Sequence, residues 1–160
     1  LYISCWFLPI LSAHQNIQIG YDGAEFAHKE FWRLLNGKIA INTLGDVFGA
    51  IFVSLGWLAN EMFVLGLVAL WKWPHIAVRI FAFSLAIMIS WQIALSKEFP
   101  FLVGYWVWVV AGVMALWLTA AHLAEARQIT IGAVLGDRIT LALFLVPALN
   151  AAIATSLGFF

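Results

Sequence analysis

The chain has 160 residues, of which 64% are hydrophobic and 10% are charged, and its formal net charge is zero. An average soluble domain has about 25% charged residues, so this composition indicates an integral membrane protein with the lipid bilayer as its first partner. The zero net charge gives no support to a nucleic-acid partner, and the single cysteine excludes an internal disulfide and a multi-cysteine metal site.

Residues 1–12 form an apolar segment that is too short to span a bilayer at about 1.5 Å per residue. One interpretation is the end of a spanning helix, which would make it a partial fifth transmembrane helix. The other is the core of a signal peptide, with the small residues Ser12 and Ala13 at its cleavage site. The retention of these residues in the chain favours the helix.

Residues 22–37 are the next predicted element, in the most polar part of the chain. Asp22 and Glu25 have the spacing of a capping box, and Gly37 is a natural terminator. Apolar residues at helical spacing, such as Phe31 and Leu34, share one face, and charged residues share the other. This pattern predicts an amphipathic interfacial helix. It would dock on the membrane surface or on a partner, or it would be a connector lying on the bundle.

Four long apolar segments follow, and each exceeds the roughly 18 residues that a spanning helix needs. Pro74 is placed in the first turn of the second segment, and Pro147 predicts a bend in the last. The predicted fold is therefore an all-α polytopic membrane protein, with residues 1–160 as a single helical bundle. The predicted transmembrane helices are residues 47–71, 75–96, 101–124 and 139–160.

Basic residues do not orient this bundle. The positive-inside rule requires more Lys and Arg on one side of the membrane than on the other. The side of the membrane that carries the amphipathic helix is called side A, and the opposite one is called side B. Side A receives Lys29, Arg33, Lys38 and Lys97, and side B receives Lys72, Arg79, Arg127 and Arg138. The equal split leaves the orientation open, and the sequence does not indicate which membrane holds the protein.

Glu61 is the most informative single residue of the predicted spans. It lies about ten residues, or roughly 15 Å, from the side B end of its span, where an unpaired carboxylate costs several kcal/mol. Asn150 is expected at a similar depth, and Arg79 about one turn inside the second span. These residues form either a structural polar clamp of Glu61 with Asn60, Arg79 or Asn150, or a protonatable site that handles protons, a quinone or a small substrate.

His75 and His122 are both predicted at side B, since one begins the second span and the other ends the third. Imidazoles from two helices can hold a haem iron or another metal. Bis-histidine haem sites usually place their ligands deeper in the bilayer, so an ordinary interfacial cluster is the competing interpretation.

The tryptophans divide into two groups by predicted depth. Trp71 and Trp73 lie at the end of a span, which is typical of an aromatic belt at the membrane interface. Trp57, Trp91 and Trp117 lie deeper, where they either pack between helices and lipid or line a cavity for a cofactor or a bound lipid.

The segment from Asn60 to Leu67 contains Glu61 and Gly66, and it is followed by a cationic turn and a span that begins with His75 and Arg79. This arrangement resembles the DoxX-like family of small four-helix membrane proteins. The resemblance implies a membrane component of a redox or quinone-linked system. The chain departs from the family pattern because it lacks the glycine-dense run after the acid and has an additional polar N-terminal region.

From these features we expect an accessory or structural subunit of a larger membrane complex, of an energy-transducing or redox kind, with other membrane subunits as partners. No catalytic activity of its own is expected. One alternative is a redox, quinone-linked or haem-linked membrane protein that uses Glu61 and Arg79. A further alternative is a small transporter, which requires a polar cavity that reaches Glu61. A subunit instead requires an apolar face that the isolated chain leaves unexplained.

Overall fold

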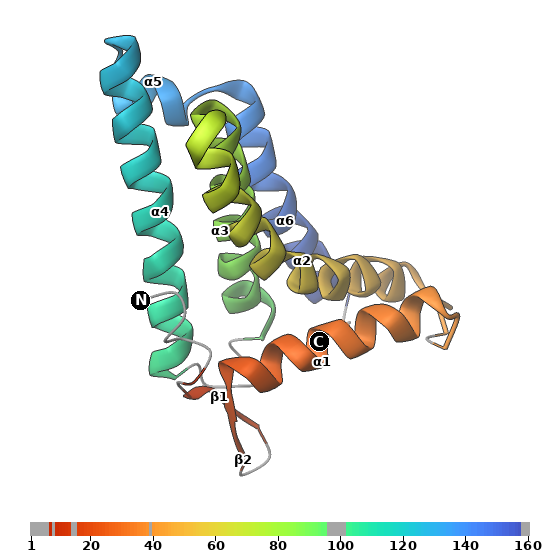
Figure 1. The fold of residues 1–160 in the computed structure, drawn as a ribbon. Coiled ribbons are helices and arrows are strands. Elements are labelled where there is room, and N and C mark those ends of the chain that lie inside the picture. The colour runs from red at the N-terminus through yellow and green to blue at the C-terminus, as the bar shows by residue number, and fades with distance from the viewer. Residues whose placement is uncertain (1–6, 8, 14–15, 39, 96–101, 158–160) are drawn as a thin grey trace.

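The computed structural model describes the chain except for residues 1–6, 8, 14–15, 39, 96–101 and 158–160 (Figure 1). Four of its helices are long and apolar enough to cross a membrane, namely α2, α3, α4 and α6. This confirms the expected number of such helices and is consistent with a multi-pass membrane protein. The elements in chain order are β1 (Pro9–Ala13), β2 (Asn16–Ile19), α1 (Gly20–Leu35), α2 (Leu44–Lys72), α3 (Pro74–Leu95), α4 (Val103–Arg127), α5 (Ile131–Leu135) and α6 (Arg138–Ser156).

The N-terminal segment corrects the sequence-based expectation. Strands β1 and β2 pair antiparallel, with Ser12 opposite Ile17, and form a short hairpin ahead of a described chain that is otherwise helical, in agreement with the predicted all-α class. The expected partial helix over residues 1–12 is wrong where the structure describes this segment, because Pro9–Ala13 is a strand. Pro9 lacks the N–H that a continuing helix requires but is tolerated as the first residue of a strand. Residues 1–6 and 8 lie outside the described residues.

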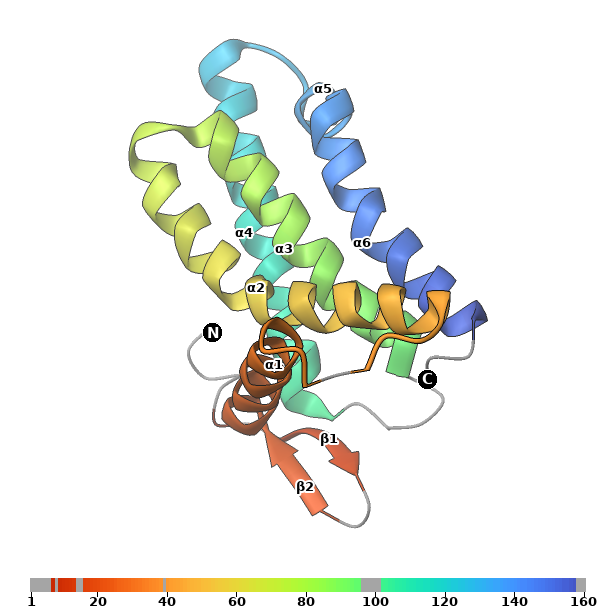
Figure 2. The ribbon, with the colours of Figure 1, turned by 90° about the vertical axis from the view of Figure 1, so that its right-hand side faces the viewer.

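Helix α3 is the centre of the bundle. It packs against α2, α4 and α6, and it is the most buried of the four long helices (Figures 1 and 2). Its buried small residues allow this close approach from several sides, as expected for helices that associate within a membrane. They are Ala77, Ala82, Ser84, Ala86, Ser90 and Ala94.

Helix α2 is bent near its middle. Its N-terminal half lies across one end of the bundle beside α1, and its C-terminal half rises along α3 (Figures 1 and 2). The hydroxyl of Ser84 on α3 donates a hydrogen bond of 2.8 Å to the carbonyl oxygen of Ala59. Gly56 lies so close to the Trp91 ring that an added Cβ would be 2.7 Å from it. A side-chain donor to the helix backbone together with a glycine is a recognised cause of a bend.

The helix ends follow capping chemistry. Thr43 is the N-cap of α2 and forms a capping box with Asp46, which explains why this apolar helix begins here. Gly37 has a φ of 65° just after α1, which confirms it as the terminator. The predicted capping box of Asp22 and Glu25 is wrong, because α1 already begins at Gly20.

Candidate functional site

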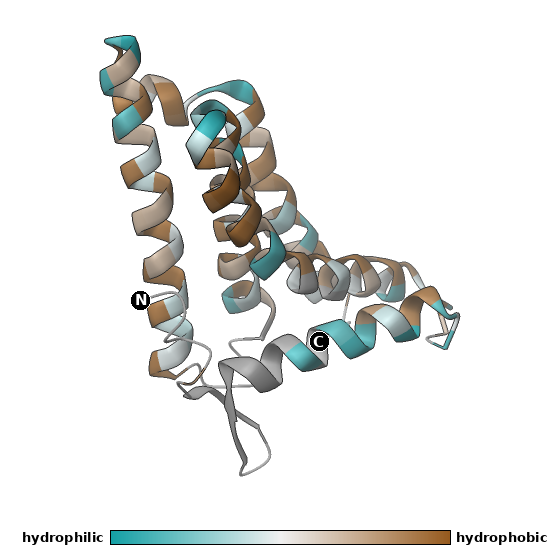
Figure 3. Cartoon of the chain, in the orientation of Figure 1, coloured by the Kyte–Doolittle hydropathy of each residue, from teal (hydrophilic) through white to brown (hydrophobic). Residues whose placement is uncertain are grey.

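The depth of Glu61 follows from the contacts of α2 with α3. Ser84 is the eleventh of the 22 residues of α3, and its hydrogen bond to Ala59 holds the middle of α2 beside the middle of α3. Glu61 lies two residues further along α2, so it sits close to the mid-level of the central helix. Figure 3 shows a hydrophilic turn at this bend, between more apolar segments of α2. This placement concerns the level of Glu61 along α3, and its expected depth within a membrane stays a prediction.

The side of α2 that carries Glu61 points away from the bundle. The Glu61 side chain is exposed, and so are Val64, Leu65 and Val68, with exposed fractions of 52%, 49% and 66%. These positions share one face at helical spacing. We call the four residues Glu61, Val64, Leu65 and Val68 the outer face of α2.

The opposite side of α2 packs on α3. Phe63 and Ala69 are buried there, and the Phe63 and Phe81 rings have centroids 5.4 Å apart. Gly66 allows this contact, because a Cβ added to it would be 2.6 Å from the Phe81 ring. This packing fixes the rotation of the C-terminal half of α2 and thereby directs Glu61 outward.

Arg79 does not pair with Glu61. Its guanidinium donates to the Asp137 carboxylate at 3.1 Å, which joins the start of α3 to the start of α6. Asp137 also caps α6 by accepting from the Thr140 backbone N–H. That hydrogen bond, and then the Arg79 guanidinium, hold the pKa of the Asp137 carboxyl below its ordinary value against an opposing effect of burial.

Asn150 is buried on α6 and donates to the Phe48 carbonyl oxygen at 3.3 Å, so it joins α6 to the N-terminal half of α2. Asn60 is half-buried next to Glu61 on α2. No hydrogen bond or ion pair involves Glu61 within the part of the chain that the structure describes. The predicted polar group is thus distributed over separate contacts, and the expected clamp of Glu61 with Arg79 or Asn150 is not formed.

His75 and His122 are both exposed, one in the first turn of α3 and the other near the end of α4. No group of three or more potential metal-ligating residues is found among the described residues. The two imidazoles do not form an enclosed site between helices, and the haem interpretation gains no support from this arrangement.

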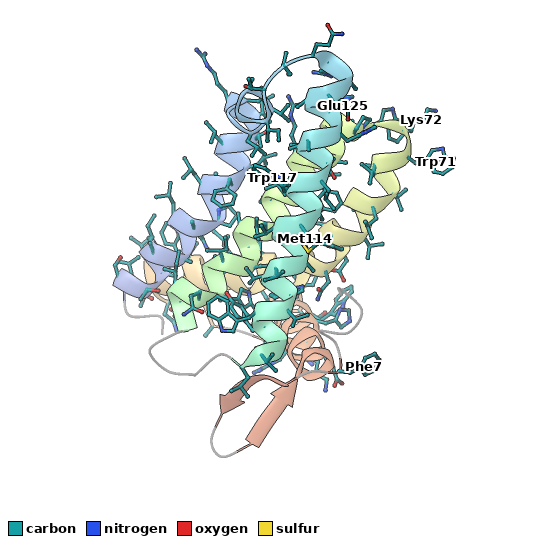
Figure 4. All side chains as sticks on the ribbon, turned by 90° about the vertical axis from the view of Figure 1, so that its left-hand side faces the viewer. Phe7, Trp71, Lys72, Met114, Trp117 and Glu125 are labelled. Atoms are coloured by element: carbon teal, nitrogen blue, oxygen red, sulfur yellow. The ribbon has the colours of Figure 1, made fainter. Side chains whose placement is uncertain are left out.

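The tryptophans are placed mainly at the outside of the bundle. Trp71 at the end of α2 is 96% exposed, and Lys72 lies 5.3 Å from the centre of the Trp73 ring, which suits an interfacial belt (Figure 4). Trp117 is 54% exposed and faces outward from α4, so it does not line an interior cavity. Trp91 is half-buried and packs against Phe52, with ring centroids 5.8 Å apart.

Two further features were not anticipated from the sequence. The first is a shallow hollow on α1, lined by charged and aromatic residues that bind one another. In it the Trp32 indole donates to His28, and Arg33 pairs with Glu30 at 2.6 Å. The second is a set of three buried polar atoms that lack a hydrogen-bond partner within the described residues. They are Trp91 Nε1, Gln92 Oε1 and Trp108 Nε1.

Comparisons of the chain with protein-family models, with curated proteins and with solved structures found no match. The resemblance to the DoxX-like family therefore gains no support, and the functional argument rests on the geometry of the chain itself.

Proposed function

We propose that this protein is a subunit of a larger membrane complex and binds its neighbour through the outer face of α2. The proposal is supported by one observation, the exposed carboxylate of Glu61 near mid-level on an otherwise apolar helix face. Ionisable residues within membrane spans almost always face protein or a water-filled cavity, because exposure to hydrocarbon is unfavourable. A protein neighbour on this face removes Glu61 from lipid.

Helix α4 provides the comparison within the same chain. Its outward side chains are apolar, including Val110, Met114 and Leu118, and no charged residue occurs between Val103 and His122. Lipid alone satisfies such a surface. The outward faces of α2 and α4 therefore differ in the presence of a carboxylate, and a carboxylate at this level requires a protein neighbour.

The proposed subunit role requires no catalytic group in this chain. The outward direction of Glu61 also argues against the transporter alternative, since Glu61 does not line a path between the described helices. The exposed imidazoles of His75 and His122 give the haem-linked alternative no enclosed site.

Native electrophoresis of membranes extracted in mild detergent tests the subunit role, with the mass and the absorbance spectrum measured on the same band. Val64→Trp on α2 is compared with Val110→Trp on α4, because the two valines are similarly exposed at 52% and 48%. We expect a colourless complex larger than the chain, lost in Val64→Trp and retained in Val110→Trp. A chain that migrates alone, or equal behaviour of the two variants, contradicts the proposal.

A further inference from the structure

We infer that the neighbour on the outer face of α2 is a transmembrane helix of a different polypeptide that carries a Lys or Arg side chain at the level of Glu61. This inference rests on the proposed function and adds the chemistry of the partner. It follows from the carboxylate that this face presents, from the pairing of Arg79 with Asp137, and from the symmetry of contacts between identical chains in a membrane.

A cation is required because the Glu61 carboxylate has no hydrogen-bond or ion-pair partner among the residues that the structure describes. Arg79 lies about one turn inside α3, but its guanidinium already forms an ion pair with Asp137 at 3.1 Å. Lys72 lies eleven residues further along α2, at the end of the helix beside Trp73. Covering Glu61 with a purely apolar helix would leave an unpaired charge buried, which is strongly unfavourable, whereas a Lys or Arg supplies both the counter-charge and hydrogen-bond donors.

A second copy of this chain does not meet that requirement. Identical chains inserted in the same direction are related by an axis along the membrane normal, so a two-fold contact through α2 would bring both Glu61 carboxylates to the same depth. Two facing carboxylates repel one another unless one is protonated. Another face of a second copy brings no cation to this level either, because the Lys and Arg residues of the four long helices as described lie within six residues of a helix end, namely Lys72, Arg79, Arg127 and Arg138. The partner that complements this face is therefore a different polypeptide.

The outer face also has the shape of a helix-binding seam. Three of its residues, Glu61, Leu65 and Val68, are followed by Lys72, which gives a seam at i, i+4, i+7 and i+11. This is the spacing of a left-handed helix pair with knobs-into-holes packing. The residues of this seam are exposed in the isolated chain. Medium-sized side chains at these positions suit a neighbour at ordinary interhelical distance, in contrast to the glycine contact of Gly66 with α3.

The test uses the purified full-length protein in phosphatidylcholine vesicles with synthetic leucine-based transmembrane peptides. One peptide carries a single central Lys, the control peptide has Leu at that position, and a third has Glu. Fluorescence energy transfer between labelled protein and labelled peptide reports binding. We expect the Lys peptide to bind about 3- to 30-fold more tightly than the Leu peptide, as polar contacts between membrane helices do.

Three variants make the test specific for Glu61. Glu61→Gln should lose the preference for the Lys peptide, Glu61→Lys should reverse it in favour of the Glu peptide, and Glu125→Gln, an exposed acid at the end of α4, should leave it unchanged. Circular dichroism and gel filtration confirm that each variant is folded. Retention of the Lys preference in Glu61→Gln overturns the inference, and so does equal binding of the Lys and Leu peptides.

Self-association provides a further decisive result. Energy transfer is also measured between two labelled copies of the protein. If it occurs in the wild type and disappears in Glu61→Gln, a second copy binds this face and the inference is overturned. A native complex that persists in Glu61→Gln and in Glu61→Leu would overturn the role of the cation while leaving the subunit proposal intact. Absence of any native complex would instead contradict the subunit proposal.

Discussion

Single polar side chains join the helices of this bundle at defined places. Arg79 and Asp137 hold the side B ends of α3 and α6 together, Asn150 joins α6 to the N-terminal half of α2, and Ser84 joins α3 to the bend of α2. Each of these contacts involves a different pair of positions, so a separate substitution tests each one. Glu61 differs from them because its side chain contributes to no such contact within the described chain.

The contact of Ser84 with Ala59 is the first to test. Ser84 is fully buried, and Ser84→Ala removes its hydrogen bond of 2.8 Å to the Ala59 carbonyl. We expect a loss of about 0.5–1.5 kcal/mol in the free energy of unfolding, measured by denaturation in detergent. Ser156→Ala, which removes an exposed hydroxyl at the end of α6, is the control and should change little. Equal effects of the two substitutions would contradict the assigned role of Ser84.

The pair of Arg79 and Asp137 should make stability depend on pH. The pKa of Asp137 is lowered in the folded chain, first by the Thr140 backbone N–H and then by Arg79. Its contribution is therefore fully present above the ordinary carboxyl value of about 3.9 and is lost as the pH falls through the lower folded value. The difference in Tm between wild type and Asp137→Asn should be constant between about pH 5 and 7 and shrink below about pH 4. A difference that does not change with pH would show that the charge of Asp137 has no part in it.

At the scale of elements, the pairing of α2 with α3 is built around a glycine. A Cβ added at Gly66 would be 2.6 Å from the ring of Phe81, which is 1% exposed and has no room to turn away. We expect Gly66→Ala to lower the free energy of unfolding by about 1–3 kcal/mol through overpacking. Gly132→Ala in α5 is the control, since its Cβ would meet only Thr130 Oγ1 at 3.9 Å. This control should be neutral or slightly stabilising, and a similar loss in both variants would refute the packing argument.

The sequence predicts where the helices begin and end better than it predicts which face of each helix is packed and which is exposed. Apolar length fixes a span almost by itself, so α2, α3, α4 and α6 were recognised close to their observed bounds. An apolar residue at a lipid-facing position looks the same in the sequence as one at a packed position, so the outward rotation of Glu61 depended on contacts such as Gly66 with Phe81. The bend of α2 lies where Ser84 of α3 donates a hydrogen bond to the α2 backbone, so the local sequence of α2 does not predict the bend.

The N-terminal hairpin and the partner of Arg79 were missed for related reasons. An apolar segment that begins with Pro9 is compatible with a strand or with the end of a helix, and length alone does not decide between them. Arg79 and Asp137 are 58 residues apart in sequence, and their contact requires α6 to return beside α3. The sequence identified Glu61 as unusual, whereas its outward direction and the absence of a polar partner for it among the described residues came from the structure.

At the scale of the whole molecule, the arrangement of the four long helices predicts which segments lie on the same side of the membrane. With Cys5 replaced by Ser, single cysteines are introduced at Lys72, Glu125 and Asn36 and labelled with a membrane-impermeant maleimide in sealed vesicles. We expect Lys72→Cys and Glu125→Cys to be labelled from one side and Asn36→Cys from the other, because α2 rises along α3 from the end that carries α1. Labelling of Lys72→Cys and Asn36→Cys from the same side would show that α2 does not cross the membrane.

The central place of α3 bears on how the protein is assembled during synthesis. Of the four long helices described, α2 precedes α3 in the chain and α4 and α6 follow it, so the surfaces of α3 for α4 and α6 are unfilled until those helices are made. Chains that end at Arg127 should retain the pairing of α2 with α3. They lack Asp137, so Arg79 loses the partner that it has in the longer chain. We expect such chains to be degraded more quickly than chains that reach Ser156, which would make the last helix the step that commits the newly made protein to its final form.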